Sequence, residues 1–158
     1  MGCANGSATL TTEGNKCVLE YFDMHGRACS IRMLLWYAGV KYVDKRNSFQ
    51  EFGEKKAKGT YLYGSLPVLY MPNGIELHQS NAIMRYIARV YRGKKNEILY
   101  PGKYNVEMSY EIDLILEESA EFLNKFQFML KKEGKQEKLA IFLEDDWAKW
   151  LASIESKL

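Results

Sequence analysis

Cysteine and histidine are scarce in this chain, and long apolar runs are missing. Its 158 residues include two histidines and three cysteines, namely Cys3, Cys17 and Cys29. Because no CxxC pair is present, we expect neither a zinc cluster nor a disulfide framework. No segment approaches the roughly 18 consecutive apolar residues that cross a bilayer, and the first residues lack the apolar run of a secretory signal. The sequence therefore predicts a cytosolic protein without a bound metal.

Basic residues are too thinly spread for a nucleic-acid surface. Residues 1–104 contain 15 Lys and Arg against 8 Asp and Glu, a net charge of +7, whereas residues 105–158 contain 7 against 12, a net charge of −5. A modest positive charge attracts a small anion, whereas nucleic acid requires a denser basic stripe. We expect a small anionic partner and no nucleic acid. The alternative is that these lysines only form solvated faces.

The first half of the chain alternates between strand and helix patterns. Residues 1–16 are small and polar, which predicts a flexible tail. Beyond it, the apolar spacing predicts the order βαβαββα. The expected elements are strands at residues 17–22, 40–43, 67–71 and 75–77 and helices around residues 31–38, 49–58 and 80–90. In the last of these helices Ile83, Ile87 and Val90 face inward, and Ser80 is a candidate N-cap.

The second half of the chain has a different pattern. Two glycines and a proline within residues 93–104 are typical of a linker. An acidic amphipathic helix is then expected over residues 104–133, followed by a second helix. The apolar stripe of the second helix is Leu139, Leu143, Trp147, Trp150, Ile154 and Leu158. The predicted organisation is a tail at 1–16, an α/β domain at 17–92, a linker at 93–104 and an all-α region at 105–158.

Four blocks of the sequence carry a family resemblance. They are Tyr21-Phe22 at the end of the first strand, followed by HGRACSIRMLL, YGSLPVLYMPNG and LHQSNAIMRYIAR. In this order they resemble the N-terminal thioredoxin-like domain of cytosolic glutathione transferases, most closely the sigma class. The resemblance covers residues 17–92 closely and residues 104–158 loosely. It implies a thioredoxin-like α/β domain followed by a partial all-α domain. The implied protein is a dimeric enzyme that uses the glutathione thiol on hydrophobic electrophiles, by conjugation, isomerisation or peroxide reduction.

By this resemblance Tyr21 is the catalytic tyrosine. A thiol like that of glutathione has a pKa of about 8.5, so little thiolate forms at neutral pH. A hydrogen bond to a charged group is worth roughly 1.5–3 kcal/mol, so one tyrosine hydroxyl lowers the thiol pKa by about 1–2 units. Arg27 matches the arginine beside that tyrosine, where it adds a fixed cation. The alternatives are a tyrosine packed in the core and a solvated arginine.

The resemblance assigns further residues to the γ-glutamyl and cysteinyl parts of glutathione. Gln79 and Ser80 grip the γ-glutamyl carboxylate at a helix N-terminus, where unpaired N–H groups and the helix dipole favour an anion. Leu66-Pro67 matches the family's cis-proline, which presents the backbone of Leu66 to the cysteinyl part. The alternatives are a plain N-cap for Ser80 and a purely structural role for Pro67, which thioredoxin folds keep without binding glutathione.

The glycine end of glutathione is the part for which this chain departs from the family pattern. Phe52 and Lys56 stand where relatives commonly have a tryptophan and a lysine that bind the glycine carboxylate. Phenylalanine lacks the indole N–H, so one hydrogen bond is missing. Lys55 or Lys58 is an alternative to Lys56. Glu121 stands near the place where sigma relatives have an aspartate that reaches over from the partner subunit.

The helical region is short for this family, because only 66 residues follow Arg92. In relatives the hydrophobic co-substrate pocket lies between the two domains, and its expected lining here includes Met24, Trp36 and Phe122. An apolar helix face needs a cover, so we expect a homodimer or a partner protein to pack on the C-terminal helices, and the alternative cover is the remainder of a longer gene product. The alternative to an enzyme is a noncatalytic glutathione-transferase-like structural or scaffolding subunit in a larger assembly.

The N-terminus contains an incomplete acylation signal. Gly2 followed by Cys3 is typical of myristoylation with palmitoylation next to it, but Gly6 stands where the motif requires Ser or Thr. We expect membrane association only if Gly2 and Cys3 are acylated.

Overall fold

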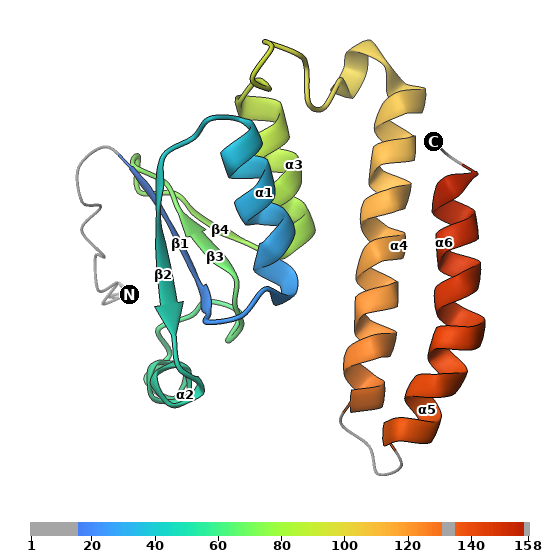
Figure 1. Ribbon diagram of the computed structural model, residues 1–158. Coiled ribbons are helices and arrows are strands. Elements are labelled where there is room, and N and C mark those ends of the chain that lie inside the picture. Colours follow the sequence, from blue (N-terminus) through green and yellow to red (C-terminus); the bar gives the residue numbers. More distant parts are fainter. Residues whose placement is uncertain (1–15, 131–134, 157–158) are drawn as a thin grey trace, which may run out of the picture. The chain divides into compact units, whose positions relative to one another are not determined.

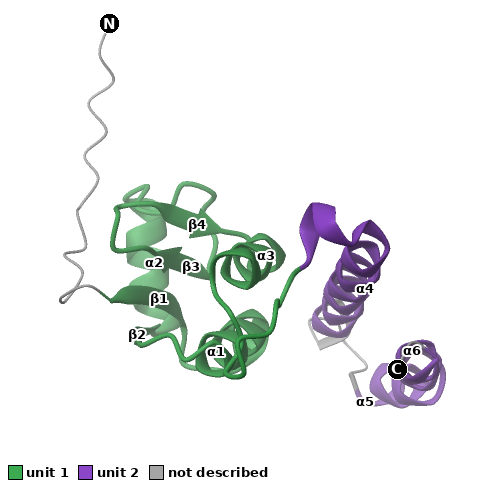
Figure 2. Cartoon of the chain, turned by 90° about the horizontal axis from the view of Figure 1, so that it is seen from above, with its two compact units in different colours: residues 1–100 green, residues 101–158 purple. Residues whose placement is uncertain are grey.

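Residues 16–130 and 135–156 are described by the structure, which is a computed structural model. The chain divides into two units, residues 1–100 and 101–158 (Figure 2). The division falls inside the segment expected as a linker. The acylation signal at Gly2 and Cys3 lies outside the described residues and stays a prediction, as does the cytosolic location. None of the helices in the described ranges is long and apolar enough to cross a membrane.

The first unit has the predicted order of elements (Figure 1). Its four-stranded sheet has the order β2-β1-β3-β4, with β1 parallel to β2 and antiparallel to β3. This topology confirms the predicted thioredoxin-like α/β domain. The elements are β1 (Cys17–Phe22), α1 (Cys29–Tyr37), β2 (Tyr42–Asn47), α2 (Phe49–Ala57), β3 (Val68–Tyr70), β4 (Glu76–His78) and α3 (Ser80–Val90).

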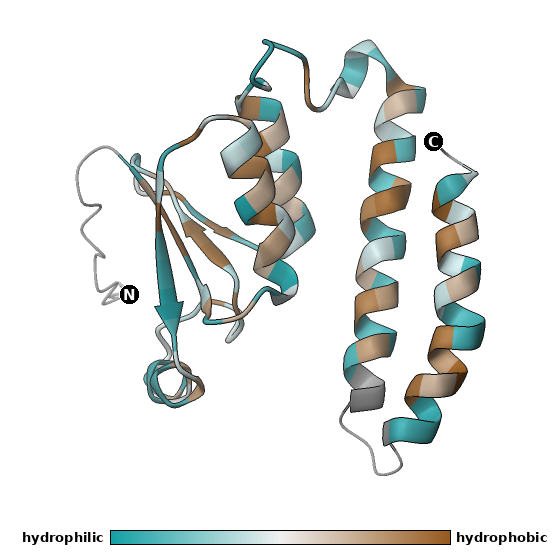
Figure 3. Ribbon diagram, viewed as in Figure 1, coloured by the Kyte–Doolittle hydropathy of each residue, from teal (hydrophilic) through white to brown (hydrophobic). Residues whose placement is uncertain are grey.

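The core lies between the sheet and the pair α1 and α3. These two helices cover one face of the sheet, and α2 lies on the other side (Figure 2). Because both faces of β1 are covered, five successive residues from Cys17 to Tyr21 are buried. The edge strand β2 is hydrophilic instead, whereas β3 is hydrophobic (Figure 3). Charged residues on an edge strand discourage pairing with another chain.

Most of the predicted core positions of the helices are confirmed. Ile31 and Leu35 of α1 and Ile83 and Ile87 of α3 are fully buried. The prediction for Val90 is wrong, because its side chain is 53% exposed. Val90 is the last residue of α3, and the chain leaves in an extended conformation at Tyr91, so the core does not reach this last turn.

One carboxylate, that of Glu20, is buried in the middle of the sheet with 1% of its side chain exposed. Its Oε1 accepts hydrogen bonds from Asn47 Nδ2 at 2.9 Å, Lys55 Nζ at 2.8 Å and Tyr61 Oη at 3.0 Å. Lys45 Nζ lies 3.6 Å away. These five residues are called the Glu20 cluster below. Burial acts to raise the pKa of the Glu20 carboxyl, but the hydrogen bonds from Lys55 and Asn47 and the two lysine charges outweigh it, so the pKa lies below its usual value.

The second unit is helical, which confirms the predicted all-α region. It contains the short turn η2 (Gly102–Tyr104), α4 (Val106–Leu130), α5 (Lys135–Ile141), the π-helical turn Phe142–Trp147 and α6 (Ala148–Glu155). Aromatic rings form its core. The ring centroid of Phe122 on α4 lies 4.9 Å from that of Phe142, 5.3 Å from Trp147 and 4.6 Å from Trp150.

The predicted apolar stripe of the last helix is wrong at Leu143, and its last member, Leu158, lies outside the described residues. Its side chain is 49% exposed, and the neighbouring Phe142 is buried instead, with 1% exposed. The π-helical turn from Phe142 to Trp147 accounts for the difference. Its hydrogen bonds join residues five apart, so the side chains rotate away from the positions that a regular helix would give them.

Glu20→Gln tests the contribution of the Glu20 cluster to stability. The variant leaves the partly buried Lys55 ammonium without its counter-ion, so we expect the free energy of unfolding at neutral pH to fall by about 3 kcal/mol. Because folding lowers the pKa of the Glu20 carboxyl, its contribution is complete above the unfolded-state pKa of about 4.3 and is lost as the pH falls below that value. Urea titrations across this range measure both proteins, and their difference should shrink in acid. Equal stability at neutral pH would contradict the assignment.

Candidate functional site

Tyr21 lies at the end of β1, with its hydroxyl against the start of the following helical turn. The Tyr21 hydroxyl oxygen accepts a hydrogen bond from the backbone N–H of Arg27 at 3.1 Å. Gly26 makes this approach possible, because a Cβ added there would lie 2.5 Å from that oxygen and its φ is +40°. Since the amide occupies an acceptor position, the hydroxyl keeps its proton for donation to another group.

A second arginine, which sequence reasoning missed, lies near the same ring. The guanidinium carbon of Arg32 is 5.8 Å from the Tyr21 ring centroid. Its Nε pairs with Asp44 at 3.1 Å, and one Nη donates to the backbone oxygen of Met24 at 2.8 Å. Arg27 was the predicted cation, and its described contact with Tyr21 is through the backbone. No sequence pattern links Arg32 on α1 with Asp44 on β2, because the pair forms only when the helix packs beside that strand.

The register of the sheet aligns three predicted features in one row. Glu20 pairs with Val68, and Val68 pairs with His78. One step further along come Tyr21 near the end of β1, Pro67 just before β3 and Gln79 just after β4. Neighbouring strands lie about 4.8 Å apart, so these residues share one edge of the sheet. The Leu66–Pro67 peptide bond at this edge is cis.

Helix α3 begins at the same edge, and its N-cap residue has an unusual backbone conformation. Gln79 is its N-cap and has φ 66° and ψ 114°, a conformation that non-glycine residues rarely adopt. The N-cap prediction for Ser80 is wrong, because Ser80 is the first residue inside the helix. No side chain of the N-cap residue bonds to the first turn. A helix N-terminus directs its first backbone N–H groups and the positive end of its dipole outward, so this end of α3 favours an anion at the edge.

Helix α2 carries the residues predicted for the glycine end of glutathione. Lys56 is exposed; its Nζ lies 5.6 Å from the Phe52 ring centroid, and its Cε lies 3.3 Å from the position that a Cβ on Gly64 would take. Lys56 therefore lies beside the loop that leads to the cis-proline. Lys55 turns the other way, into the Glu20 cluster, so it is not the alternative to Lys56. Lys58 is the exposed C-cap of the helix.

The remaining predicted residues are spread over both units. Glu121 lies on α4 of the second unit, exposed and 3.6 Å from Lys125. Phe122 packs in the aromatic core of that unit. Met24 is exposed in the loop after β1, with 43% of its surface accessible. The predicted lining of a co-substrate pocket is therefore not assembled within either unit.

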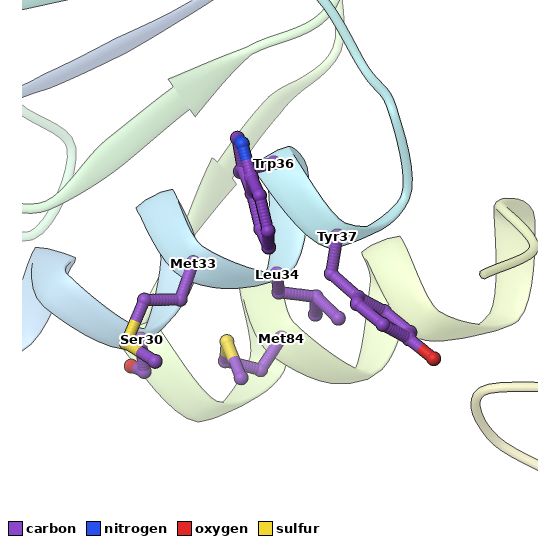
Figure 4. A pocket seen from close by; sticks show the side chains of 6 residues that line it. All are labelled: Ser30, Met33, Leu34, Trp36, Tyr37 and Met84. Carbon is purple, nitrogen blue, oxygen red and sulfur yellow. The ribbon is translucent and has the colours of Figure 1, made fainter. Parts of the chain in front are cut away.

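Trp36 belongs to a separate apolar pocket on α1 and α3. This pocket has a volume of about 620 Å³ and includes the exposed side chains of Met33 and Trp36 (Figure 4). Lys94 Nζ lies 3.1 Å from the centroid of the Trp36 ring. Trp36 is seven residues beyond the first residue of α1, a distance of about 10 Å along the helix axis from the Tyr21 end.

Comparison with known proteins relates the chain to the glutathione S-transferases. Residues 17–89 match the family model described as glutathione S-transferase, N-terminal domain. The chain is 35% identical over 120 residues to hematopoietic prostaglandin D synthase from Gallus gallus, covering 76% of this chain and 55% of that protein. It is 34% identical over 118 residues to S-crystallin 4 from Enteroctopus dofleini, covering 74% and 50%. Among solved structures, a sigma class glutathione transferase from Fasciola hepatica superposes with a TM-score of 0.69 at 27% identity, over 87% of this chain and 63% of that one.

The extent of these matches differs between the two units. The chain spans about half the length of the curated relatives it matches. The family model falls within the first unit, on the residues that carry the four sequence blocks. By these matches the chain is a relative of sigma-class glutathione transferases and carries the N-terminal domain of the glutathione S-transferase family at residues 17–89.

Proposed function

We propose that the chain binds glutathione at the sheet edge of Tyr21, Pro67 and Gln79 and activates its thiol for attack on hydrophobic electrophiles. The observation that carries this proposal is the strand register, which aligns Tyr21, the cis-proline Pro67 and the N-terminus of α3. A sigma-class transferase and a prostaglandin D synthase among the relatives support conjugation or isomerisation as the chemistry. Peroxide reduction by the same thiolate belongs to the same proposal.

In this proposal each end of the tripeptide binds a different element. The γ-glutamyl carboxylate accepts hydrogen bonds at the start of α3, from Gln79 and Ser80. The backbone of Leu66 pairs with the cysteinyl part, and Lys56 binds the glycine carboxylate as a point charge. Phe52 contributes a ring face rather than an N–H. The uncapped first turn of α3 supports the first assignment, and the position of Lys56 beside Gly64 supports the last.

The chemistry assigned to Tyr21 is donation of a hydrogen bond to the sulfur. The Arg27 amide donates to the same hydroxyl oxygen, which polarises the O–H and strengthens it as a donor. The Arg32 guanidinium adds a positive charge near the ring. The thiol proton leaves to solvent, and the thiolate attacks the electrophilic carbon. With a halide substrate the C–S bond forms while the carbon–halogen bond breaks, and the halide ion leaves with that electron pair.

We also propose a homodimer, or a partner protein that covers the C-terminal helices. Leu143 and Leu151 of the second unit are exposed, which supports a need for cover within the described residues. In the dimer, the partner's Glu121 reaches the bound tripeptide. Exposure of Glu121 on the surface of α4 supports this assignment.

A noncatalytic structural or scaffolding subunit is the second candidate. The chain is as similar to S-crystallin 4 as it is to prostaglandin D synthase, at 34% and 35% identity. Glutathione binding and turnover distinguish the two candidates, since a scaffold needs neither.

Tyr21→Phe tests the proposed donor. Loss of the hydroxyl raises the pKa of bound glutathione by about 1–2 units, so we expect the conjugation rate at neutral pH to fall about 10- to 100-fold. The dissociation constant of glutathione should change little, because the tripeptide is held elsewhere. Stopped-flow kinetics with an aromatic halide and calorimetric titration with glutathione measure both quantities. Unchanged turnover would remove Tyr21 from the mechanism, and no binding by the wild type at millimolar glutathione would overturn the proposal.

Gly26→Ala tests the close approach of the loop to the Tyr21 hydroxyl. The added methyl group collides with that oxygen at a positive φ, so the hydroxyl must move. We expect a loss of turnover comparable to that of Tyr21→Phe. Gly53→Ala on α2 is the matched control, because a Cβ there meets nothing within 4 Å, and its turnover should equal that of the wild type.

Lys56→Ala tests the proposed contact with the glycine carboxylate. Removal of one charge-assisted hydrogen bond should raise the dissociation constant of glutathione about tenfold, with turnover at saturation unchanged. Lys58→Ala removes a neighbouring exposed lysine and serves as the control. An equal effect of both substitutions would mean that only the general charge of α2 matters.

A further inference from the structure

Few side chains hold helix α2 on the first unit. No residue of α2 is buried, and only Phe52 and Lys55 are partly buried. The ring of Phe22 lies 5.0 Å from that of Phe52 and 4.7 Å from that of Phe49, whose side chain is 67% exposed, and the Phe52 ring lies 5.5 Å from that of Tyr61. These aromatic contacts bury no side chain of α2 completely, so the position of the helix also depends on a second attachment.

The second attachment is ionic and buried. Lys55 Nζ donates to Glu20 Oε1 at 2.8 Å and to Asn47 Oδ1 at 2.6 Å, while Asn47 donates to the same carboxylate. Tyr61, which stacks on Phe52, also donates to Glu20. The two attachments therefore meet at one carboxylate, and the loss of that charge weakens both.

We propose that Glu20 is a positioning residue that holds α2, and with it Lys56, in place for glutathione. The inference rests on the proposed function of the site. Lys55 and Lys56 are consecutive on α2, so their side chains leave the helix about 100° apart. Fixing Lys55 on the Glu20 carboxylate sets the direction in which Lys56 points, which is toward the loop at Gly64.

The positioning role of Glu20 and the proposed chemistry of Tyr21 lie on opposite faces of β1. Glu20 and Tyr21 are consecutive on β1, and successive side chains of a strand point to opposite faces of the sheet. Glu20 contacts α2, whereas Tyr21 contacts Gly26 and Arg27 next to α1. Loss of the Glu20 charge therefore weakens the binding of glutathione and leaves the activation of its thiol unchanged.

The size of the effect follows from the population of α2 in its attached position. If the attached state falls to about one molecule in ten, the dissociation constant of glutathione rises about tenfold. Turnover at saturating glutathione stays within about twofold, because the ligand selects the attached state. A residue with only a general structural role would not separate the two quantities in this way.

The experiment uses the full chain with Glu20→Gln, Lys55→Met and the double variant, with Glu54→Gln as the control on an exposed part of α2. Glutathione affinity is measured by calorimetry, turnover by steady-state kinetics, thermal stability by calorimetric scanning, and the mobility of α2 by amide hydrogen exchange. We expect about tenfold weaker binding and faster exchange in α2 for both single variants, and wild-type values for Glu54→Gln.

The double variant separates positioning from stability. It also removes the Lys55 ammonium, the closer of the two cations that Glu20→Gln leaves without their counter-ion, so part of the thermal stability lost in Glu20→Gln should return, while glutathione binding stays weak and α2 still exchanges rapidly. Recovery of affinity together with stability would overturn the proposal, as would wild-type affinity in Glu20→Gln. If the wild type binds no glutathione, the proposed function fails instead, and slow exchange of α2 in Glu20→Gln would then reject the positioning role on its own.

Discussion

The ionised carboxylate of Glu20 organises the α2 side of the first unit. A buried charge is costly unless hydrogen bonds and opposite charges compensate it, and the Glu20 cluster provides both. Burial and the Glu20 charge raise the pKa values of Tyr61 and Tyr70, so both phenols stay protonated. The Glu20 cluster therefore helps to hold α2 on the sheet, whereas α1 and α3 are held there by their buried apolar faces.

The proposed site depends on strand direction rather than on any single element. Since β1 and β4 run the same way and β3 runs against them, the end of β1, the start of β3 and the end of β4 meet at one edge. Tyr21, Pro67 and Gln79 are far apart in the sequence and become neighbours only through this pairing. The pairing within one sheet therefore brings the Tyr21 hydroxyl, the cis peptide and the start of α3 to the same edge.

The close contacts at this edge impose specific residue types. Gly26 is required because Tyr21 occupies the space of a side chain, and the Arg27 amide then reaches the hydroxyl. Arg32 lies beside the same ring through its pair with Asp44 on β2. The charges near Tyr21 therefore come from two elements, because Arg32 lies on α1 and its partner Asp44 lies on β2. The direct hydrogen bond to the Tyr21 hydroxyl comes from the Arg27 amide after β1.

The sequence by itself determined the order of strands and helices, the two-part organisation and the family of the first unit. Local periodicity and the four blocks are sufficient for these, because strand and helix patterns depend on neighbours in the chain. Tertiary structure decided that Lys55 turns inward while Lys56 stays exposed, that Arg32 lies by Tyr21, and that Phe142 rather than Leu143 is buried. Each of these depends on a partner from another element or on a local change of helix type, which a pattern within one segment does not contain.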